Sequence, residues 1–284
     1  MNAKSINSSW LRIFVYMSTK LPIGIFDSGI GGLTVASAIH RVLPNEELVY
    51  FGDTAHLPYG DKSPEAIKYF SLKIAQFLLD KQCKMIVIAC NTASSLAYHD
   101  LVEFIGDKIP VLNVIDPVVD FVAEEKQLTC VGVIGTKATI NSDLYAKKLK
   151  LARPGIEVKS LATPLLAPMI EEGFFSNTIS KTVINSYLSS PKLKNIDSLI
   201  LACTHYPLIQ EEIEEFYHEK VTIINSAAIV AQSVQKKLAE LNLLSKVEAK
   251  KHQFFVSDYT SSFEKSTKLF FGEKIHLKLK NIWS

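Results

Sequence analysis

The sequence has few cysteines and no spacing that would place them in disulfides or zinc sites. Its 284 residues contain four cysteines and no Cys-x-x-Cys pair: Cys83, Cys90, Cys130 and Cys203. A secreted disulfide framework needs more, so free thiols in a reducing, cytoplasmic compartment are expected. The seven histidines show no two-histidine-plus-carboxylate spacing, and no metal is expected.

The sequence also lacks an excess of charge of either sign and any long hydrophobic run. Its 31 basic and 29 acidic residues give a net charge of +2, which argues against nucleic acid as the main partner and favours a small-molecule ligand. The apolar stretch 10–17, WLRIFVYM, contains Arg12 and is too short to span a membrane. Residues 1–21 are therefore interpreted as an amino-terminal extension, with Met17 as a plausible alternative start, and no membrane association is expected.

Short runs rich in Val and Ile alternate with helical patterns, which is typical of βα units around a mainly parallel sheet. A helix is predicted over 64–82 because Ser63 can cap it and Pro64 fits its first turn. A second, solvent-facing amphipathic helix is predicted over 207–219. Strands are expected at 22–26, 46–51, 84–89, 109–115, 128–135, 156–162, 196–202, 221–225, 252–257 and 275–280.

Two pairs of segments resemble each other at similar separations. GIFDS (24–28) resembles GVIGT (132–136), and IACNT (88–92) resembles LACTH (201–205). The pattern predicts two pseudo-symmetric α/β domains with mainly parallel central sheets that face each other across a shared cleft. The expected boundaries place 22–116 plus 226–284 in the first domain and 117–225 in the second.

Cys90 and Cys203 each end an apolar run and are followed by polar side chains: Asn91, Thr92, Thr204 and His205. In open α/β sheets, ligands bind beyond the carboxyl ends of the strands, where helix amino ends present N–H groups. A lone free cysteine is usually a small buried hydrophobe, which is our interpretation of Cys83 and Cys130. The matched positions of Cys90 and Cys203 instead predict a shared chemical site.

Two polar segments follow the first two expected strands. FDSGIGGLTV (26–35) lacks a phosphate-binding frame and its lysine, and its glycines are expected to form a tight turn with close backbone approach. Asp27 could accept a thiol proton or bind a cation there, or simply cap a helix. GDTAHLPYGDKS (52–63) is expected to cover a site, with an ordinary surface turn as the alternative.

Six segments in order resemble the cofactor-independent glutamate racemases of the aspartate/glutamate racemase superfamily: GIFDSGIGGLTV, GDTAHLPYG, ACNTAS, VGVIGTKAT, PLLAPMIEEG and LACTHYP. The similarity extends from Pro22 to FFVSD and LFFGEKI near the end of the chain. It implies a cytoplasmic enzyme, expected to be a homodimer, that encloses glutamate between its domains, needs no cofactor, and supplies D-glutamate for peptidoglycan synthesis.

The resemblance also implies roles for individual residues. Cys90 and Cys203 would be the two acid/base residues, with Asp27 assisting Cys90 and His205 assisting Cys203. Thr139 and Glu171 match further parts of the pattern without a defined role. The residues implied to surround the amino acid are Asp27, Ser28, Tyr59, Gly60, Asn91, Thr92, Thr136, Thr204 and His205.

The chemistry of racemisation agrees with two cysteines. The α-hydrogen must leave one face of the α-carbon and a hydrogen must return to the other face, which two opposed thiols can do as thiolate and thiol. A free cysteine has a pKa of about 8.5, so a modest lowering makes the thiolate accessible at neutral pH. Backbone amides at the strand ends could stabilise the charge that develops on the α-carboxylate.

Three alternatives remain from the sequence. The substrate could be aspartate, hydantoin or a related acid, although the CTHYP and LPYG segments favour glutamate. The two cysteines could instead form a reversible disulfide in a redox or ligand-binding module. A nucleotide-binding protein is disfavoured by Asp27 and by the missing lysine.

Overall fold

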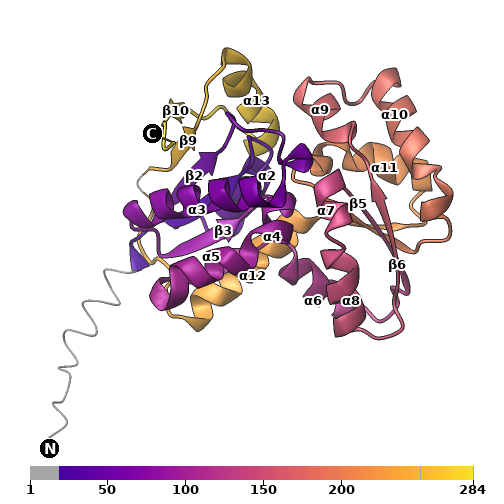
Figure 1. Ribbon diagram of the computed structural model, residues 1–284, viewed down its shortest axis with the longest axis horizontal. Helices are drawn as coiled ribbons and strands as arrows, with labels where there is room; N and C mark the ends of the chain where they lie inside the picture. Colours follow the sequence, from indigo (N-terminus) through magenta and orange to yellow (C-terminus); the bar gives the residue numbers. More distant parts are fainter. Residues whose placement is uncertain (1–18, 250, 284) are drawn as a thin grey trace, which may run out of the picture.

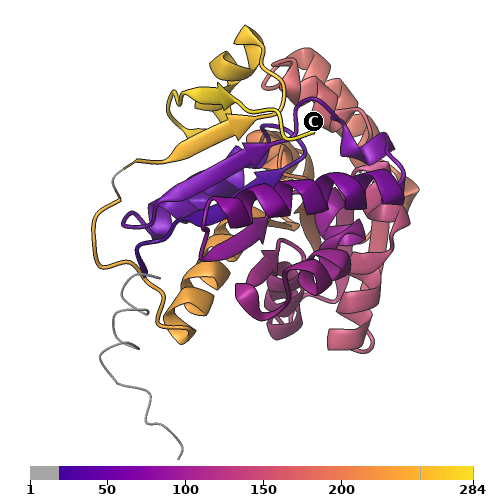
Figure 2. The same cartoon turned by 60° about the vertical axis from the view of Figure 1, so that its left-hand side comes forward.

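Two parallel β-sheets form the two halves of the molecule, which lie side by side in Figures 1 and 2. The computed structural model describes residues 19–249 and 251–283, so most of the expected amino-terminal extension lies outside the described residues. The first sheet has the order β10-β9-β2-β1-β3-β4 and the second the order β6-β5-β7-β8. All strand pairs are parallel, which confirms the predicted α/β class. "First half" and "second half" below denote each sheet with its covering helices.

Each of the ten predicted strands overlaps an observed one. In the first sheet the strands are β1 (Ile23–Asp27), β2 (Leu48–Gly52), β3 (Met85–Ile88), β4 (Val111–Asn113), β9 (Gln253–Val256) and β10 (Leu277–Leu279). In the second they are β5 (Cys130–Gly135), β6 (Glu157–Ala162), β7 (Ser198–Ala202) and β8 (Thr222–Ile224). The central strands are mostly apolar because helices cover both faces of each sheet.

Helices cover the first sheet on both sides. Ile25 faces a core with α2 (Leu33–Val42), α12 (Ser226–Glu240) and α13 (Ser261–Phe271). Its neighbour Phe26 points to the opposite face, where α3 (Pro64–Asp80), α4 (Asn91–Leu96) and α5 (Tyr98–Ile105) pack. Short 3₁₀ turns at Tyr59–Asp61 and Gly106–Lys108 complete this half.

The second sheet is covered in the same way. One face packs against α6 (Asp116–Glu124) and α8 (Leu144–Ala152), and α7 (Lys137–Asn141) follows β5. The other face packs against α9 (Leu166–Glu171), α10 (Thr178–Leu188) and α11 (Gln210–Tyr217), with 3₁₀ turns at Pro191–Leu193 and Tyr206–Ile209. One hydrophobic cluster contains both Leu33 of α2 and Leu201 of β7, so the two halves share apolar packing.

The two helices predicted from the sequence, over 64–82 and 207–219, can be compared with the structure. Ser63 Oγ accepts a hydrogen bond from Ala66 N and Pro64 lies at the start of α3, which confirms that start. The chain leaves the helix at Asp80, and Gln82 adopts a positive φ of 57°. The solvent-facing helix predicted over 207–219 is confirmed in part as α11, with Glu211 and Glu215 exposed. Its predicted start was wrong, because Pro207 lies in a separate 3₁₀ turn, and Glu212 is buried where it accepts a hydrogen bond from Ser180 Oγ.

The repeated segments occupy equivalent places in the two sheets. β1 lies between β2 and β3, and β5 lies between β6 and β7. Phe26 pairs with Ile88 in the first sheet, and Ile134 pairs with Leu201 in the second. β3, which precedes Cys90, therefore runs beside β1, and β7, which precedes Cys203, runs beside β5. In each sheet the two neighbouring strands end at the same edge.

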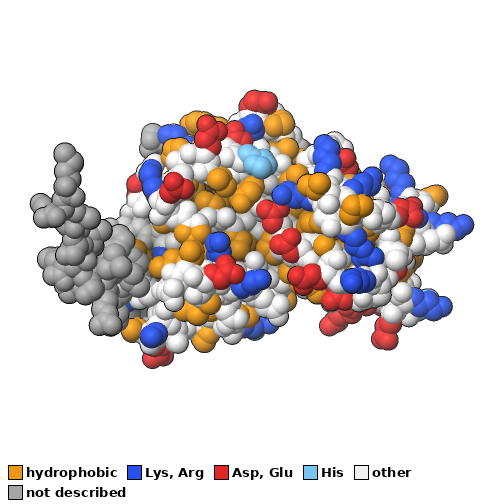
Figure 3. Space-filling view, turned by 90° about the horizontal axis from the view of Figure 1, so that it is seen from below, with side chains coloured by type: hydrophobic (Ala, Val, Ile, Leu, Met, Phe, Trp, Pro, Cys, Tyr) orange, Lys and Arg blue, Asp and Glu red, His pale blue; other side chains and the backbone are white. Residues whose placement is uncertain are grey.

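The surface agrees with the balanced composition. Lys and Arg side chains are interspersed with Asp and Glu over the face seen in Figure 3. Within the described ranges, the helices include none long and apolar enough to cross a membrane.

A buried ion pair lies near the amino ends of the first sheet's strands. Lys84, just before β3, contacts the Glu46 carboxylate, and the two side chains are 1% and 2% exposed. The Lys84 ammonium also donates to the backbone carbonyls of Thr19 and Leu243, each at 2.7 Å, and Glu46 Oε1 accepts from Ser245 N at 2.7 Å. The pair therefore connects this edge of the sheet to the segment after α12.

Replacing Lys84 with alanine should lower the free energy of unfolding by about 3–5 kcal/mol, because Glu46 would remain as a buried charge without a cation. Urea unfolding measures the change. Lys68→Ala is the matched control: Lys68 pairs with Asp100 at exposures of 42% and 37%, and its loss should cost less than about 1 kcal/mol. Equal losses in the two variants would contradict this account of the buried pair.

Candidate active site

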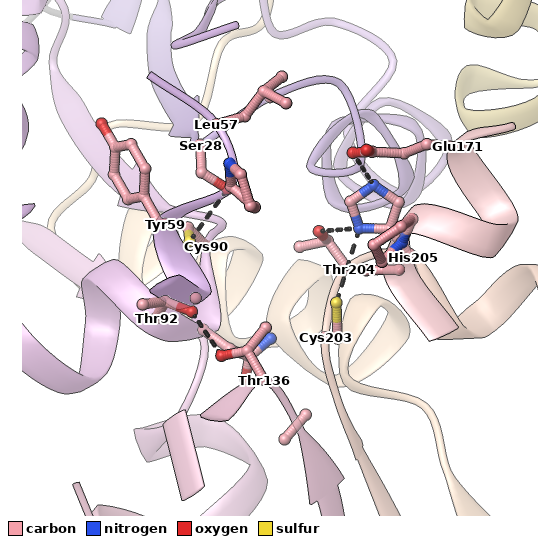
Figure 4. Close-up of a pocket in the computed structure, with 17 residues that line it drawn as sticks. Ser28, Leu57, Tyr59, Cys90, Thr92, Thr136, Glu171, Cys203, Thr204 and His205 are labelled. Atoms are coloured by element: carbon pink, nitrogen blue, oxygen red, sulfur yellow. Dashed lines mark hydrogen bonds and ion pairs between the residues drawn. The ribbon is translucent and has the colours of Figure 1, made fainter. Parts of the chain in front are cut away.

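A cavity lies between the two halves at the carboxyl ends of their strands (Figure 4). It holds about 50 Å³ of free space, several times the roughly 10–15 Å³ that one water needs by a similar measure. The size suits a small molecule and not a nucleotide. Its wall comprises Ser28, Gly29, Leu57, Pro58, Tyr59, Gly60, Cys90, Asn91 and Thr92 from the first half, and Thr136, Ala167, Pro168, Glu171, Ala202, Cys203, Thr204 and His205 from the second.

Cys90 follows β3 and caps α4. Its Sγ accepts a hydrogen bond from Ala93 N at 3.4 Å and donates one to Ser28 Oγ at 3.5 Å. Burial, together with the nearby charge of Asp27, raises the pKa of Cys90 to about 12 despite these hydrogen bonds. Cys90 is therefore a thiol at neutral pH and can donate a proton.

Cys203 follows β7 and has a different environment. Its Sγ lies 3.6 Å from His205 Nδ1, while His205 Nε2 lies 2.8 Å from Glu171 Oε1. Burial lowers the pKa of His205, but the hydrogen bonds to Cys203 and Glu171 outweigh it and raise that pKa well above its usual value. A protonated His205 places a positive charge beside the Cys203 sulfur.

The glycine-rich turn after β1 packs directly against this histidine. A Cβ atom at Gly31 would lie 2.4 Å from His205 Cε1 and 2.6 Å from Thr204 Oγ1, so a larger residue would displace the ring. This confirms the prediction that the glycines let another group pack closely against the backbone of this turn. The group that packs there is the His205 ring.

Asp27 does not line the cavity. Its Oδ2 accepts hydrogen bonds from Gly29 N at 3.2 Å and Gly32 N at 2.8 Å, which close the tight turn. The amino end of α2 has no side-chain cap, so the alternative prediction of a helix cap was wrong. The carboxylate is fully buried, and its Oδ1 has no hydrogen-bond partner in the described part of the chain. Burial raises the pKa of Asp27. Its charge raises the pKa of Cys90, so it acts on that thiol from behind the cavity wall.

The loop after β2 forms one wall of the cavity, which confirms that it covers a site. The Tyr59 hydroxyl donates to Asp53 Oδ2 at 2.7 Å, and Ser257 Oγ donates to Asp53 Oδ1 at 2.7 Å. His56 Nδ1 lies 2.9 Å from the same carboxylate, and its ring contacts Trp283 of the carboxyl-terminal segment, which returns to this loop in Figure 2. The hydroxyl of Tyr59 thus holds the loop in place.

Three threonine hydroxyls meet across the boundary between the halves. Thr92 Oγ1 lies 2.9 Å from Thr136 Oγ1 and 3.2 Å from Thr139 Oγ1, and the last two are 3.0 Å apart. Thr92 and Thr136 line the cavity, with Thr139 buried behind them. Figure 4 shows the Thr92 and Thr136 hydroxyls pointing toward each other. Such a cluster can donate hydrogen bonds to a carboxylate.

The structure brings together every site residue named from the sequence except Asp27 and Thr139, which lie behind the wall. Sequence reasoning missed Leu57, Pro58, Ala167, Pro168 and Ala202, because apolar side chains carry no chemical signal. The described cavity wall contains neither Lys nor Arg. The described residues also contain no cluster of three or more His, Cys, Asp or Glu that could hold a metal ion.

Iodoacetamide should alkylate Cys90 slowly at pH 7.5, because only thiolates react and the pKa of Cys90 is raised to about 12. Its labelling rate should increase roughly tenfold per pH unit from 7 to 10. Peptide mass spectrometry measures the rate, and Cys90 labelling that levels off below pH 9 would contradict the raised pKa.

Comparisons with known proteins place these features in a family. The model of the family described as Asp/Glu/Hydantoin racemase matches residues 31–234. A glutamate racemase from Geobacter metallireducens is 43% identical over 254 residues, which cover 89% of this chain and 93% of that protein.

Solved structures give the same result. The crystal structure of glutamate racemase from Francisella tularensis in complex with D-glutamate has a TM-score of 0.88 and 40% identity, over 93% of this chain and 99% of that chain. An aspartate racemase homologue from Pyrococcus horikoshii, with a TM-score of 0.53 and 21% identity over 77% of this chain and 99% of that chain, shares the fold. The chain belongs to the Asp/Glu/Hydantoin racemase family.

Proposed function

We propose that this protein interconverts L-glutamate and D-glutamate by proton transfer between the α-carbon and two cysteines. The observation that carries the proposal is the presence of Cys90 and Cys203 in one small cavity, on walls from different halves of the molecule (Figure 4). A substrate carbon between the two walls would present a different face to each sulfur.

The two thiols differ in a way that suits an acid and a base. In one direction, Cys203 as a thiolate removes the α-hydrogen as a proton, and the Cys90 thiol donates a proton to the opposite face. In the other direction the roles are exchanged. His205 stabilises the charge at Cys203, and Glu171 holds the imidazole through its Nε2. Asp27 favours the protonated form of Cys90.

Neutral donors would bind the carboxylates of the substrate. Because the described cavity wall has no Lys or Arg, the candidates are hydroxyl groups, backbone N–H groups and the Asn91 amide. Preorganised backbone N–H groups at the strand ends, in a site that excludes water, would stabilise the charge that grows on the α-carboxylate as the proton leaves. The proposed substrate contacts are Ser28, Tyr59, Gly60, Asn91, Thr92, Thr136, Thr204 and His205.

Glutamate is preferred to aspartate as the proposed substrate because the relatives with about 40% identity are glutamate racemases, one of them bound to D-glutamate. We infer a cytoplasmic role in supplying D-glutamate for peptidoglycan, and a homodimer. The proposed domains are 22–116 plus 226–284 and 117–225. The strands support this division, since those of the second sheet all fall between residues 130 and 224.

Incubation with L-glutamate in deuterated water, without added cofactor, should give both enantiomers and loss of the α-hydrogen signal. Proton NMR and chiral chromatography measure the two results. Cys90→Ala and Cys203→Ala should each reduce racemisation at least about a hundredfold, since each removes one of the two acid/base groups, whose individual contributions are typically about 10²–10⁴-fold.

Cys83→Ala is the matched control, because Cys83 is equally buried but packs in the core under β1. It should retain near-normal turnover. Normal turnover in either active-site variant would refute the two-base assignment. Faster turnover of aspartate than of glutamate by the unmodified protein would refute the substrate assignment.

A further inference from the structure

Tyr145 contacts the cavity indirectly, through Asn91. It lies on α8 in the second half, is 3% exposed, and packs in the core between α8 and the second sheet. Its hydroxyl reaches across to the first half and donates to Asn91 Oδ1 at 2.8 Å. Asn91 directly follows Cys90 and lines the cavity, whereas Tyr145 is not part of the wall.

The other end of the Asn91 amide is unsatisfied. Asn91 is 3% exposed, and its Nδ2 has no hydrogen-bond partner within the described residues. A buried polar group without a partner is costly, and an amide nitrogen carries two hydrogens that need acceptors. Because Asn91 is part of the cavity wall, this donor is suited to a ligand that accepts hydrogen bonds, such as a carboxylate.

The orientation of an asparagine amide depends on its partners, since its oxygen and nitrogen have the same shape. In this structure the amide oxygen faces Tyr145, whose hydroxyl donates to Oδ1. Burial, followed by the nearby charges of Asp116 and Cys203, raises the pKa of the Tyr145 hydroxyl, so it stays protonated and can donate to the amide oxygen. The reverse orientation would leave the oxygen free in the cavity, where it would repel a carboxylate.

We propose that Tyr145 is a positioning residue that fixes the Asn91 amide so that Nδ2 is available to a carboxylate of the substrate. The proposal rests on the proposed racemase function and adds a residue that the sequence did not indicate. Tyr145 does not touch the reacting atoms, and its effect passes entirely through Asn91.

Tyr145→Phe tests this role because it removes one oxygen and leaves the ring. KM for glutamate, and the Kd for D-glutamate by titration calorimetry, should rise about tenfold, the factor expected for one oriented hydrogen bond. The kcat should change less than about threefold, because the donor binds ground state and transition state alike. Tyr217→Phe is the matched control: its hydroxyl is buried without a hydrogen-bond partner in the described chain, and its loss should leave KM unchanged.

The decisive measurement is a double-mutant cycle with Asn91→Ala. Once the amide is absent, Tyr145→Phe should change KM by less than about twofold. A purely structural tyrosine would raise KM by the same factor in both backgrounds, and that result would overturn the proposal. An unchanged KM and Kd in the single variant would also overturn it.

Asn91→Asp provides a second test that keeps the Tyr145 contact and replaces the donor with an oxygen. Both KM and Kd should rise at least as much as in Asn91→Ala, and a smaller rise would contradict the donor role of Nδ2.

Circular dichroism and thermal melts establish that each variant folds. If the unmodified protein racemises glutamate but Tyr145→Phe raises KM by the same factor with and without Asn91→Ala, only the proposed role of Tyr145 is refuted. If the unmodified protein does not racemise glutamate, the proposed function itself fails.

Discussion

The direction of the strands is the constraint on which the site depends. Parallel strands bring their carboxyl ends to one edge of a sheet, and in this molecule two such edges border one cavity. Cys90 leaves β3 beside the end of β1, and Cys203 leaves β7 beside the end of β5. Two turns far apart in the chain therefore provide opposite walls, and the packing that joins the halves through α2 and β7 sets the distance between them.

The two cysteines are both buried but have different charged neighbours. Around Cys90 the nearest charge is a buried carboxylate, so desolvation and repulsion both favour the neutral thiol. Around Cys203 an imidazole is held by Glu171, and the hydrogen bonds to it outweigh its desolvation. The difference between the two surroundings comes from one aspartate behind the first turn and one histidine–glutamate pair beside the second.

Polar side chains also join the two halves, beside the apolar packing of α2 and β7. The threonine hydroxyls at 92, 136 and 139, the Tyr145–Asn91 hydrogen bond and the hydrogen bond from Thr34 Oγ1 to the Thr204 carbonyl at 3.0 Å all cross the boundary. These groups are directional, so they fix orientation as well as distance. Gly31 contributes through the absence of a side chain, which lets the His205 ring pack against the first turn.

The sequence by itself determined the strands, the cap at Ser63 and the placement of Cys90 and Cys203 at strand ends, because those features follow from local periodicity and from polar residues at strand ends. Most other residues of the cavity wall were indicated by the resemblance of the sequence motifs to a known family. It could not determine that Asp27 lies behind the wall, that Glu212 is buried, or that Tyr145 bonds to Asn91. The apolar wall residues were also missed, since Leu57 and Ala167 differ from core residues only in where they lie. Only the tertiary structure decided these points, because burial and hydrogen bonding between residues distant in the chain depend on how the two halves pack together.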